Sequence, residues 1–327
     1  MKKSLLILLF TCWALFFAAF RPVMPFAAET AAFPDGTPVT GGRILMGTIG
    51  EPSNLIPYMA SDSASGEITG LLYVAPLKYD KDLNVVPLAA ASYEVLEGGR
   101  LLRFVLRDDI RWEDGVPLTA DDVEFTYKLM IDPKTPTAYS GDFLAIESFK
   151  KTGRLSFEVR YAKPFARSLM TWMGAILPKH VLEGQDIMTT PVARKPIGAG
   201  PYRLAKWDAG SMLTLTASDT YFEGRPNLDE VVYRIIPDPS TMFLELKAGK
   251  LDMMSLSPQQ YLRQTQGPQW ERDWRKYRYL SFSYTFLGFN LEHPFFKDVR
   301  VRRAISMAID RQSLIDGVLL GQGVPTV

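Results

Sequence analysis

The sequence predicts an α/β fold with two or more domains. Segments that alternate apolar and polar residues, the pattern of a half-buried strand, are interleaved with segments that carry apolar residues every three or four positions, the pattern of an amphipathic helix. The 327 residues, 47% hydrophobic and 22% charged, are enough to bury more than one hydrophobic core. The chain is therefore expected to be a globular protein.

The N-terminus predicts a secretory leader. Two lysines precede an uncharged apolar run at 5–20, and small residues follow, so we expect a signal peptide at 1–28. An uncleaved membrane anchor is the alternative, because the apolar run is long for a signal peptide. The one cysteine, Cys12, lies in this run, and its loss with the leader leaves no thiol, which suits an oxidising compartment.

The charge balance argues against a nucleic-acid ligand. The formal net charge is +1, but Lys2, Lys3 and Arg21 belong to the predicted leader. Without them Lys plus Arg falls from 37 to 34 against 36 acidic residues, a net charge of −2. The mature chain therefore lacks the basic surplus that binding to phosphate backbones requires.

Strands are predicted where apolar and polar residues alternate. A linker at 29–41, rich in proline and glycine, separates the leader from the first strand. The clearest strand is 102–106, because Leu102, Phe104 and Leu106 alternate with Arg103 and Arg107, the pattern of a strand with one face buried. The predicted strands, in chain order, are 43–49, 102–106, 155–161, 213–216, 231–236 and 280–286.

Helices are predicted from capping residues and apolar stripes. Thr119 is expected to be the N-cap of a helix whose first turn is acidic, which favours the helix dipole, and Pro133 stops it. Apolar residues between Val301 and Ile309 recur at helical spacing and predict a stripe that faces a core. The predicted helices are 119–131, 240–248 ending on Gly249, 298–309, and 312–320 ending on Gly321.

Motifs for catalysis and for cofactors are missing from the sequence. The two histidines, His180 and His293, are far apart and lie beside prolines, so we predict no catalytic residue, no metal site and no cofactor. The glycines at 198 and 200 lack the third glycine of a dinucleotide fingerprint, and we interpret them as flexible backbone at a crossing between lobes. The acidic run at 108–114 lacks the ligand spacing of a calcium loop and predicts a turn. An exported hydrolase is therefore disfavoured.

Five motif blocks occur in order along the chain. Residues 103–122 read RFVLRDDIRWEDGVPLTADD, and the other blocks are GEPSNLIP at 50–57, IGAGPYRL at 197–204 with Trp207, YFEGRP at 221–226 with IPD at 236–238, and DVRVRRAI at 298–305 with AIDR at 308–311. As a set they resemble the signature of family 5 of the extracellular solute-binding proteins, the dipeptide and oligopeptide receptors of ABC importers. The resemblance runs from about residue 42 to the last residue.

The resemblance implies a periplasmic-binding-protein-like fold of type II with two lobes. The first lobe would be discontinuous, at 42–74 and 181–283, with a small subdomain inserted at 75–180. Residues 284–327 would supply the crossing strand and the start of the second lobe. Because members of the family continue through the whole second lobe, the sequence is expected to be truncated, with one side of the helix at 301–309 left without its covering layer.

The resemblance also implies a function. The chain is expected to be a periplasmic monomer that is not an enzyme, captures di- and oligopeptides by closure of its two lobes, and delivers them to the permease subunits of an ABC transporter in the inner membrane. One alternative is a member of the family that carries another solute, such as a nickel complex, an opine or an oligosaccharide. Another is a truncated chain that no longer transports and acts as a chaperone-like or sensory binding protein.

The resemblance points to seven ligand-binding positions. A receptor for varied peptides is expected to bind the ligand main chain as an added strand, with side chains in roomy pockets. Each group of residues also has a competing interpretation. The serines could belong to a solvated turn, the tyrosine could be an ordinary packed side chain, and the phenylalanines could pack in a core. The anchor for the peptide amino group is expected beyond residue 327. The predicted positions are Ser61, Asp62, Ser63, Tyr139, Phe286, Phe289 and Asn290.

Overall fold

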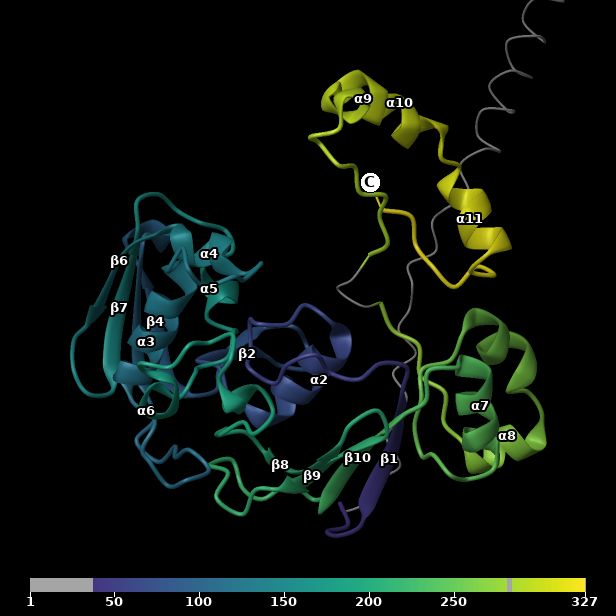
Figure 1. Ribbon diagram of the computed structural model, residues 1–327, viewed down its shortest axis with the longest axis horizontal. Coiled ribbons are helices and arrows are strands. Elements are labelled where there is room, and N and C mark those ends of the chain that lie inside the picture. The colour runs from purple at the N-terminus through teal and green to yellow at the C-terminus, as the bar shows by residue number, and fades with distance from the viewer. Residues whose placement is uncertain (1–37, 281–283, 327) are drawn as a thin grey trace, which may run out of the picture. The chain divides into compact units, whose positions relative to one another are not determined.

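The computed structural model describes residues 38–280 and 284–326. The chain forms two compact units, one of Thr37–Ser255 and one that includes Leu256–Val327. Figure 1 labels most of the helices and strands of both units, and each unit is described by itself. The predicted leader and most of the predicted linker at 29–41 lie outside the described residues.

Strands far apart in the sequence form the first sheet of the Thr37–Ser255 unit (Figure 1). Its order is β1-β10-β9-β8, with β1 (Arg43–Thr48) parallel to β10 (Glu230–Ile235), while β9 (Met212–Ala217) and β8 (Tyr202–Asp208) are antiparallel to their neighbours. The N-terminal strand β1 therefore completes a sheet made otherwise from residues 202–235. Helix α2 (Ser63–Leu72) packs against β8, and α7 (Pro239–Lys247) follows β10 in the chain.

The second sheet comes from the sequence between β1 and β8. Its strands are antiparallel in the order β4-β5-β7-β6, namely β4 (Ala90–Leu96), β5 (Leu101–Leu106), β7 (Ser156–Tyr161) and β6 (Ile146–Lys151). Helix α3 (Ala120–Ile131) packs against β6. The same region contains the hairpin of β2 (Leu77–Tyr79) and β3 (Val85–Pro87), the 3₁₀ turns η1 (Glu97–Gly99) and η2 (Pro191–Ala193), and the short helices α4 (Ser140–Leu144), α5 (Ser168–Thr171) and α6 (Lys179–Leu182).

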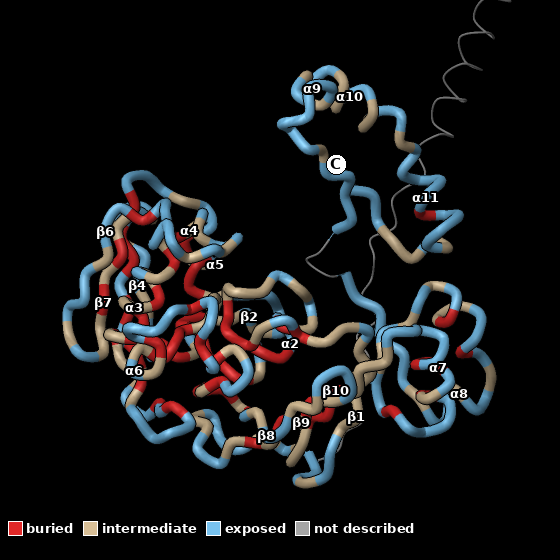
Figure 2. Tube along the Cα trace, viewed as in Figure 1, coloured by how far each residue is buried: buried red, intermediate tan, exposed pale blue. Residues whose placement is uncertain are grey.

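The second sheet has one aromatic face and one charged face. On the inner face Phe104 stacks on Phe157, with ring centroids 4.8 Å apart. On the outer face Arg103 donates to Glu94 and Glu158 of the neighbouring strands, each at 2.9 Å. Successive side chains of a strand point to opposite faces, so this is the alternation predicted for β5. Figure 2 shows buried residues gathered around this sheet and α3.

The predicted N-cap of α3 is confirmed. Thr119 Oγ1 accepts a hydrogen bond from the Asp121 N–H at 3.3 Å, and Asp122 Oδ2 accepts one from the Thr119 N–H at 2.8 Å, which closes a capping box. Asp122 Oδ1 also accepts from the Lys179 N–H at 3.0 Å and so ties α3 to α6. Burial raises the pKa of the Asp122 carboxyl, although these backbone donors oppose that effect.

The unit that includes Leu256–Val327 has helices and connecting loops in its described residues. Its elements are the π-helix η3 (Gln260–Gln264), α8 (Pro268–Asp273), α9 (Pro294–Lys297), α10 (Val299–Ala308) and α11 (Arg311–Gly317). The stripe of α10 that was predicted to face a core is not buried: Val301 and Ile305 are half-buried and Ala304 is exposed. Helix α9 packs against α10 but leaves these positions partly exposed.

Most predicted elements agree with the structure to within one residue at each end. The strand predicted at 280–286 is wrong where it can be checked, because neither Leu280 nor residues 284–286 form a strand; residues 281–283 lie outside the described ranges. A strand needs a hydrogen-bonded neighbour, and no described segment pairs with this one. The helix predicted at 312–320 ends at Gly317, since glycine is a weak helix former, and Gly321 follows with φ +77°.

Candidate ligand-binding site

Three of the predicted ligand-binding residues lie where α2 begins. Ser61 and Asp62 end the loop that follows β1, and Ser63 is the first residue of the helix. Ser61 and Ser63 are exposed, and their hydroxyls make no hydrogen bond with any described residue. Both hydroxyls can therefore donate to or accept from a ligand.

Helix α2 itself was not predicted from the sequence. Gly66 and Gly70 lie in its interior, and glycine disfavours helix by about 1 kcal/mol relative to alanine. The signal that could have revealed the helix is the capping residue Asp62 followed by apolar residues at helical spacing, of which Ile68 and Leu72 are buried.

Asp62 is the N-cap of α2. Its Oδ1 accepts from the Ser65 N–H at 2.7 Å, and its Oδ2 accepts from the hydroxyls of Ser53 at 2.6 Å and Ser65 at 2.8 Å. Partial burial acts to raise the pKa of this carboxyl, but the hydrogen bonds from Ser53 and Ser65 outweigh it, so the pKa is lowered. The side chain of Asp62 thus fixes the position of its neighbours Ser61 and Ser63.

Replacing Asp62 by alanine is expected to lower the free energy of unfolding by about 1 kcal/mol at neutral pH, the usual effect of losing an N-cap. Because the folded-state pKa is lowered, the carboxylate stabilises the fold above its unfolded pKa, and this contribution is lost as the pH falls through the folded pKa. The difference in unfolding midpoint between the wild type and Asp62→Ala should therefore shrink when urea titrations are moved from about pH 6 to about pH 2. A difference that is constant over this range would contradict the assignment.

Glu51 fixes the other end of the loop that leads to Ser61. Its carboxylate accepts from Trp207 Nε1 at 2.7 Å and from the Gly210 N–H at 3.1 Å. The Arg194 guanidinium lies over the Trp207 ring, 3.9 Å from its centroid, with Nη1 3.6 Å from Glu51 Oε1. The motif block at 50–57 and the block that contains Trp207 therefore meet in the folded chain.

Tyr139 lies between α3 and α4 and is 46% exposed. Its ring makes an edge-to-face contact with Tyr58, three residues before Ser61, with ring centroids 6.1 Å apart. Its hydroxyl makes no hydrogen bond with a described residue. The contact with Tyr58 brings Tyr139 next to the loop that also carries Ser61, a neighbourhood that the sequence alone did not reveal.

The other three predicted residues belong to the second unit. Phe286 is 73% exposed, so the competing interpretation of core packing is wrong for this residue within the described chain. Phe289 is half-buried, with its ring centroid 5.2 Å from that of Phe296. Asn290 Oδ1 accepts from the Glu292 N–H at 3.0 Å, which shapes the turn before α9.

The described residues contain no cluster of three or more histidine, cysteine, aspartate or glutamate side chains placed to hold a metal ion. Within the same ranges, no helix has both the length and the apolar character of a membrane-crossing segment. Ser61, Ser63 and Tyr139 themselves offer hydroxyls and an aromatic ring, which suit reversible binding through hydrogen bonds and stacking.

Comparison with known proteins places this geometry in a family. Residues 84–327 match the family model described as bacterial extracellular solute-binding proteins, family 5 Middle. The chain is 33% identical over 294 residues to the oligopeptide-binding protein AppA of Bacillus subtilis, a match that covers 88% of this chain and 53% of AppA. The chain thus spans about half the length of the curated relatives that it matches.

Solved structures show the same likeness. The structure of Bacillus subtilis AppA in complex with a nonapeptide superposes with a TM-score of 0.78 at 31% identity, covering 89% of this chain and 58% of AppA. NikZ from Campylobacter jejuni in complex with Ni(L-His) superposes with a TM-score of 0.71 at 25% identity, covering 85% of this chain and 55% of NikZ. The fold described above is therefore the mixed α/β fold of type II periplasmic binding proteins, of which this chain covers part.

Proposed function

Because this chain belongs to family 5 of the bacterial extracellular solute-binding proteins, we propose that it captures peptides for an ABC importer. The observation that carries this proposal is the likeness to AppA, which was solved with a nonapeptide and shares both sequence and fold with this chain. The exposed hydroxyls of Ser61 and Ser63 and the half-exposed ring of Tyr139 are the groups that would contact the peptide.

In this proposal the ligand is bound without chemical change. Hydroxyls and backbone groups would satisfy the peptide main chain, while an aromatic ring can stack on ligand side chains of many kinds. Residues 42–74 and 181–283 would form the first lobe, 75–180 the inserted subdomain, and 284–327 the crossing and the start of the second lobe. The discontinuous first sheet, built from β1 and β8 to β10, supports this division. The closed lobes would retain the ligand until the permease opens them.

The proposed location follows from the same family. An extracellular solute-binding protein of an importer works in the periplasm or outside the cell, and we propose that the leader at 1–28 directs the chain there. The partners would be the permease subunits of the importer, and the binding protein would act as a monomer. We propose no nucleic-acid partner for this protein.

The test is capture from peptide pools. The purified protein is incubated with random-sequence peptides of about two to nine residues, passed through a desalting column, and examined by native mass spectrometry. We expect bound species whose added mass corresponds to peptides, and we expect isothermal titration with the recovered peptides to give saturable heat. An unliganded mass from every pool would contradict peptide capture.

A second candidate ligand is a metal complex of an amino acid, which the likeness to NikZ with bound Ni(L-His) favours. Such a ligand brings its own donor atoms, so a cluster of metal-ligating side chains in the protein is not required. The same experiment with nickel and L-histidine in place of the peptide pools distinguishes capture of a metal complex from capture of peptides. An added mass with the nickel complex, and none with peptides, would replace peptide capture while keeping the class of solute-binding protein.

A further inference from the structure

Tyr58 lies where three segments of the Thr37–Ser255 unit meet. Its hydroxyl donates to the Ala175 carbonyl oxygen at 2.8 Å, and its own carbonyl oxygen accepts from Thr137 Oγ1 at 2.8 Å. Thr137 Oγ1 in turn accepts from the Tyr139 N–H at 3.1 Å. A chain of hydrogen bonds therefore runs from the loop that carries Ser61 to the backbone of Tyr139.

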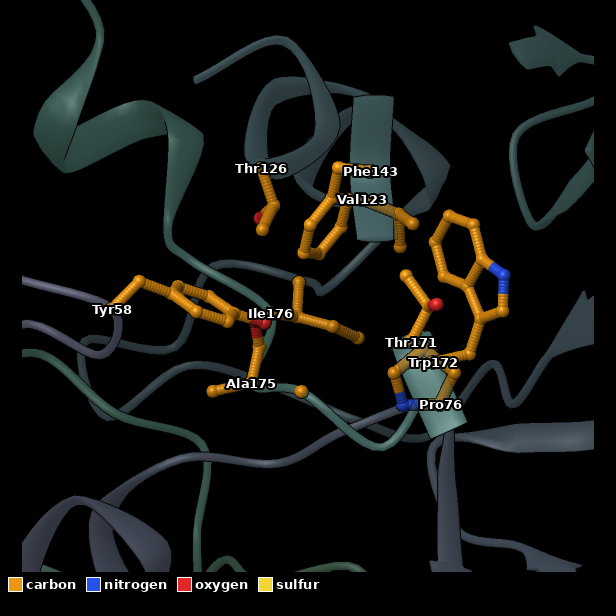
Figure 3. A pocket seen from close by; sticks show the side chains of 10 residues that line it. Tyr58, Pro76, Val123, Thr126, Phe143, Thr171, Trp172, Ala175 and Ile176 are labelled. Atoms are coloured by element: carbon orange, nitrogen blue, oxygen red, sulfur yellow. The ribbon is translucent and has the colours of Figure 1, made fainter. Parts of the chain in front are cut away.

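The ring of Tyr58 also supports the same neighbours. Besides its contact with Tyr139, it makes an edge-to-face contact with Phe143 of α4, with centroids 5.9 Å apart. Figure 3 shows the ring pointing toward Ala175 and Ile176, with Phe143 close by. Tyr58 thus contacts both ends of the segment 139–143 through one side chain.

The backbone of Tyr58 adopts an unfavourable conformation. Its φ is +71°, in the left-handed region that residues with a Cβ atom seldom occupy. Such a conformation persists where surrounding contacts determine it, and here the carbonyl bond to Thr137 and the hydroxyl bond to Ala175 do so. Outliers of this kind gather at functional sites, where the surrounding contacts hold a group in a defined place.

Gly174 makes the hydroxyl bond possible. A Cβ atom at position 174 would lie 2.2 Å from the Tyr58 hydroxyl oxygen, so any side chain there would displace the ring. Burial raises the pKa of Tyr58, so the hydroxyl stays protonated and remains a donor at every physiological pH. The hydroxyl can therefore donate to the Ala175 carbonyl oxygen throughout that pH range.

Tyr58 does not itself bind a ligand from this side. The cavity beside its ring, lined also by Val123, Thr126, Phe143 and Trp172, has a volume of about 10 Å³. A space of that size holds one water molecule at most. A ligand therefore cannot reach the ring of Tyr58 through this cavity.

We propose that Tyr58 is a positioning residue that fixes the Tyr139 ring relative to the loop of Ser61 and Ser63. This inference rests on the proposed function, in which Tyr139, Ser61 and Ser63 contact the bound peptide. A receptor for varied peptides gains affinity when its few side-chain contacts are held in place before the ligand arrives. Tyr58 would hold these contacts in place through its hydroxyl, its carbonyl oxygen and its ring.

Hydrogen exchange tests the positioning without any ligand. Tyr58→Phe and Thr137→Val each remove one hydroxyl and keep the size of the side chain, so neither is expected to unfold the protein. Amide exchange in residues 132–145 should become roughly tenfold faster in both variants, while exchange in β5 and β7 stays as in the wild type. Tyr93→Phe is the matched control, because it also removes a hydroxyl that donates to a backbone carbonyl, that of Val85 at 3.2 Å.

The peptide pools then test the functional consequence. Retained peptide should bind roughly fivefold or more weakly to Tyr58→Phe than to the wild type, and this loss should disappear when both proteins also carry Tyr139→Ala. Unchanged exchange in residues 132–145, or a loss of affinity that persists in the Tyr139→Ala background, would overturn the proposal. If the wild type retains no peptide, the proposed function fails, and the exchange experiment still decides whether Tyr58 positions Tyr139.

Discussion

Gly198→Ala is expected to destabilise the Thr37–Ser255 unit by about 3 kcal/mol or more. A Cβ atom at position 198 would lie 1.9 Å from the carbonyl oxygen of Leu72, the last residue of α2. Backbone atoms cannot rotate away as a side chain can, so the whole segment would have to shift. That shift would break the bond from the Gly200 N–H to the Leu72 carbonyl, 2.8 Å, and the bond from the Glu113 N–H to the Gly198 carbonyl, also 2.8 Å.

Gly70→Ala is the matched control for this prediction. Gly70 lies in the same helix that Gly198 touches, but no atom lies within 4 Å of its missing Cβ, and alanine favours helix. This variant should raise stability by roughly 0.5 to 1 kcal/mol. Urea titrations followed by circular dichroism measure both changes. If Gly198→Ala unfolds at the same urea concentration as the wild type, that result would contradict the close contact between the two backbones.

This contact corrects the interpretation of Gly198 and Gly200. We expected flexible backbone at a crossing between lobes, whereas the structure requires glycine there because the chain passes directly against the end of α2. A sequence without its fold cannot distinguish these two uses of glycine, since both depend only on the absence of a side chain. The nearest neighbour of Gly198 is more than 120 positions away in the sequence, so no local pattern signals it.

The strands and capped helices could be predicted because their causes are local. The alternation along β5 and the capping box at Thr119 involve residues within a few positions of one another. The strand predicted near Leu280 failed for the opposite reason. Its alternating residues meet the local requirement, but a strand also needs a partner, and none of the described segments supplies one.

The candidate site was predictable only in part. Motif order pointed to Ser61 and Tyr139, but the contacts that place them are not visible in the sequence. The bond from Tyr58 to Ala175 joins residues 117 positions apart, and a positive φ at a tyrosine has no sequence signature. The motif residues Glu51 and Trp207 join two segments that are far apart in the sequence, through the bond from Trp207 Nε1 to the Glu51 carboxylate.

Phe104→Ala is expected to lower the free energy of unfolding by about 3 to 5 kcal/mol, the usual effect of deleting a fully buried phenylalanine. Phe104 is 0% exposed and contributes to a row of rings that crosses the second sheet, stacked on Phe157 and 5.5 Å from Trp172. The row of rings continues from Phe157 through Phe149 to Tyr127 of α3, and the loop with Tyr139 is the next segment after α3. A variant that still folds should therefore also lose retention of peptides.

Two further variants test whether the loss of stability comes from the burial of Phe104 or from its position in a strand. Phe104→Leu keeps most of the apolar volume and should cost about 1 to 1.5 kcal/mol. Val105→Ala changes the next residue on the same strand, whose side chain is 42% exposed on the opposite face, and should cost less than about 1 kcal/mol. Thermal unfolding followed by circular dichroism ranks the variants. Equal losses for Phe104→Ala and Val105→Ala would show that the aromatic face is not the core of this sheet.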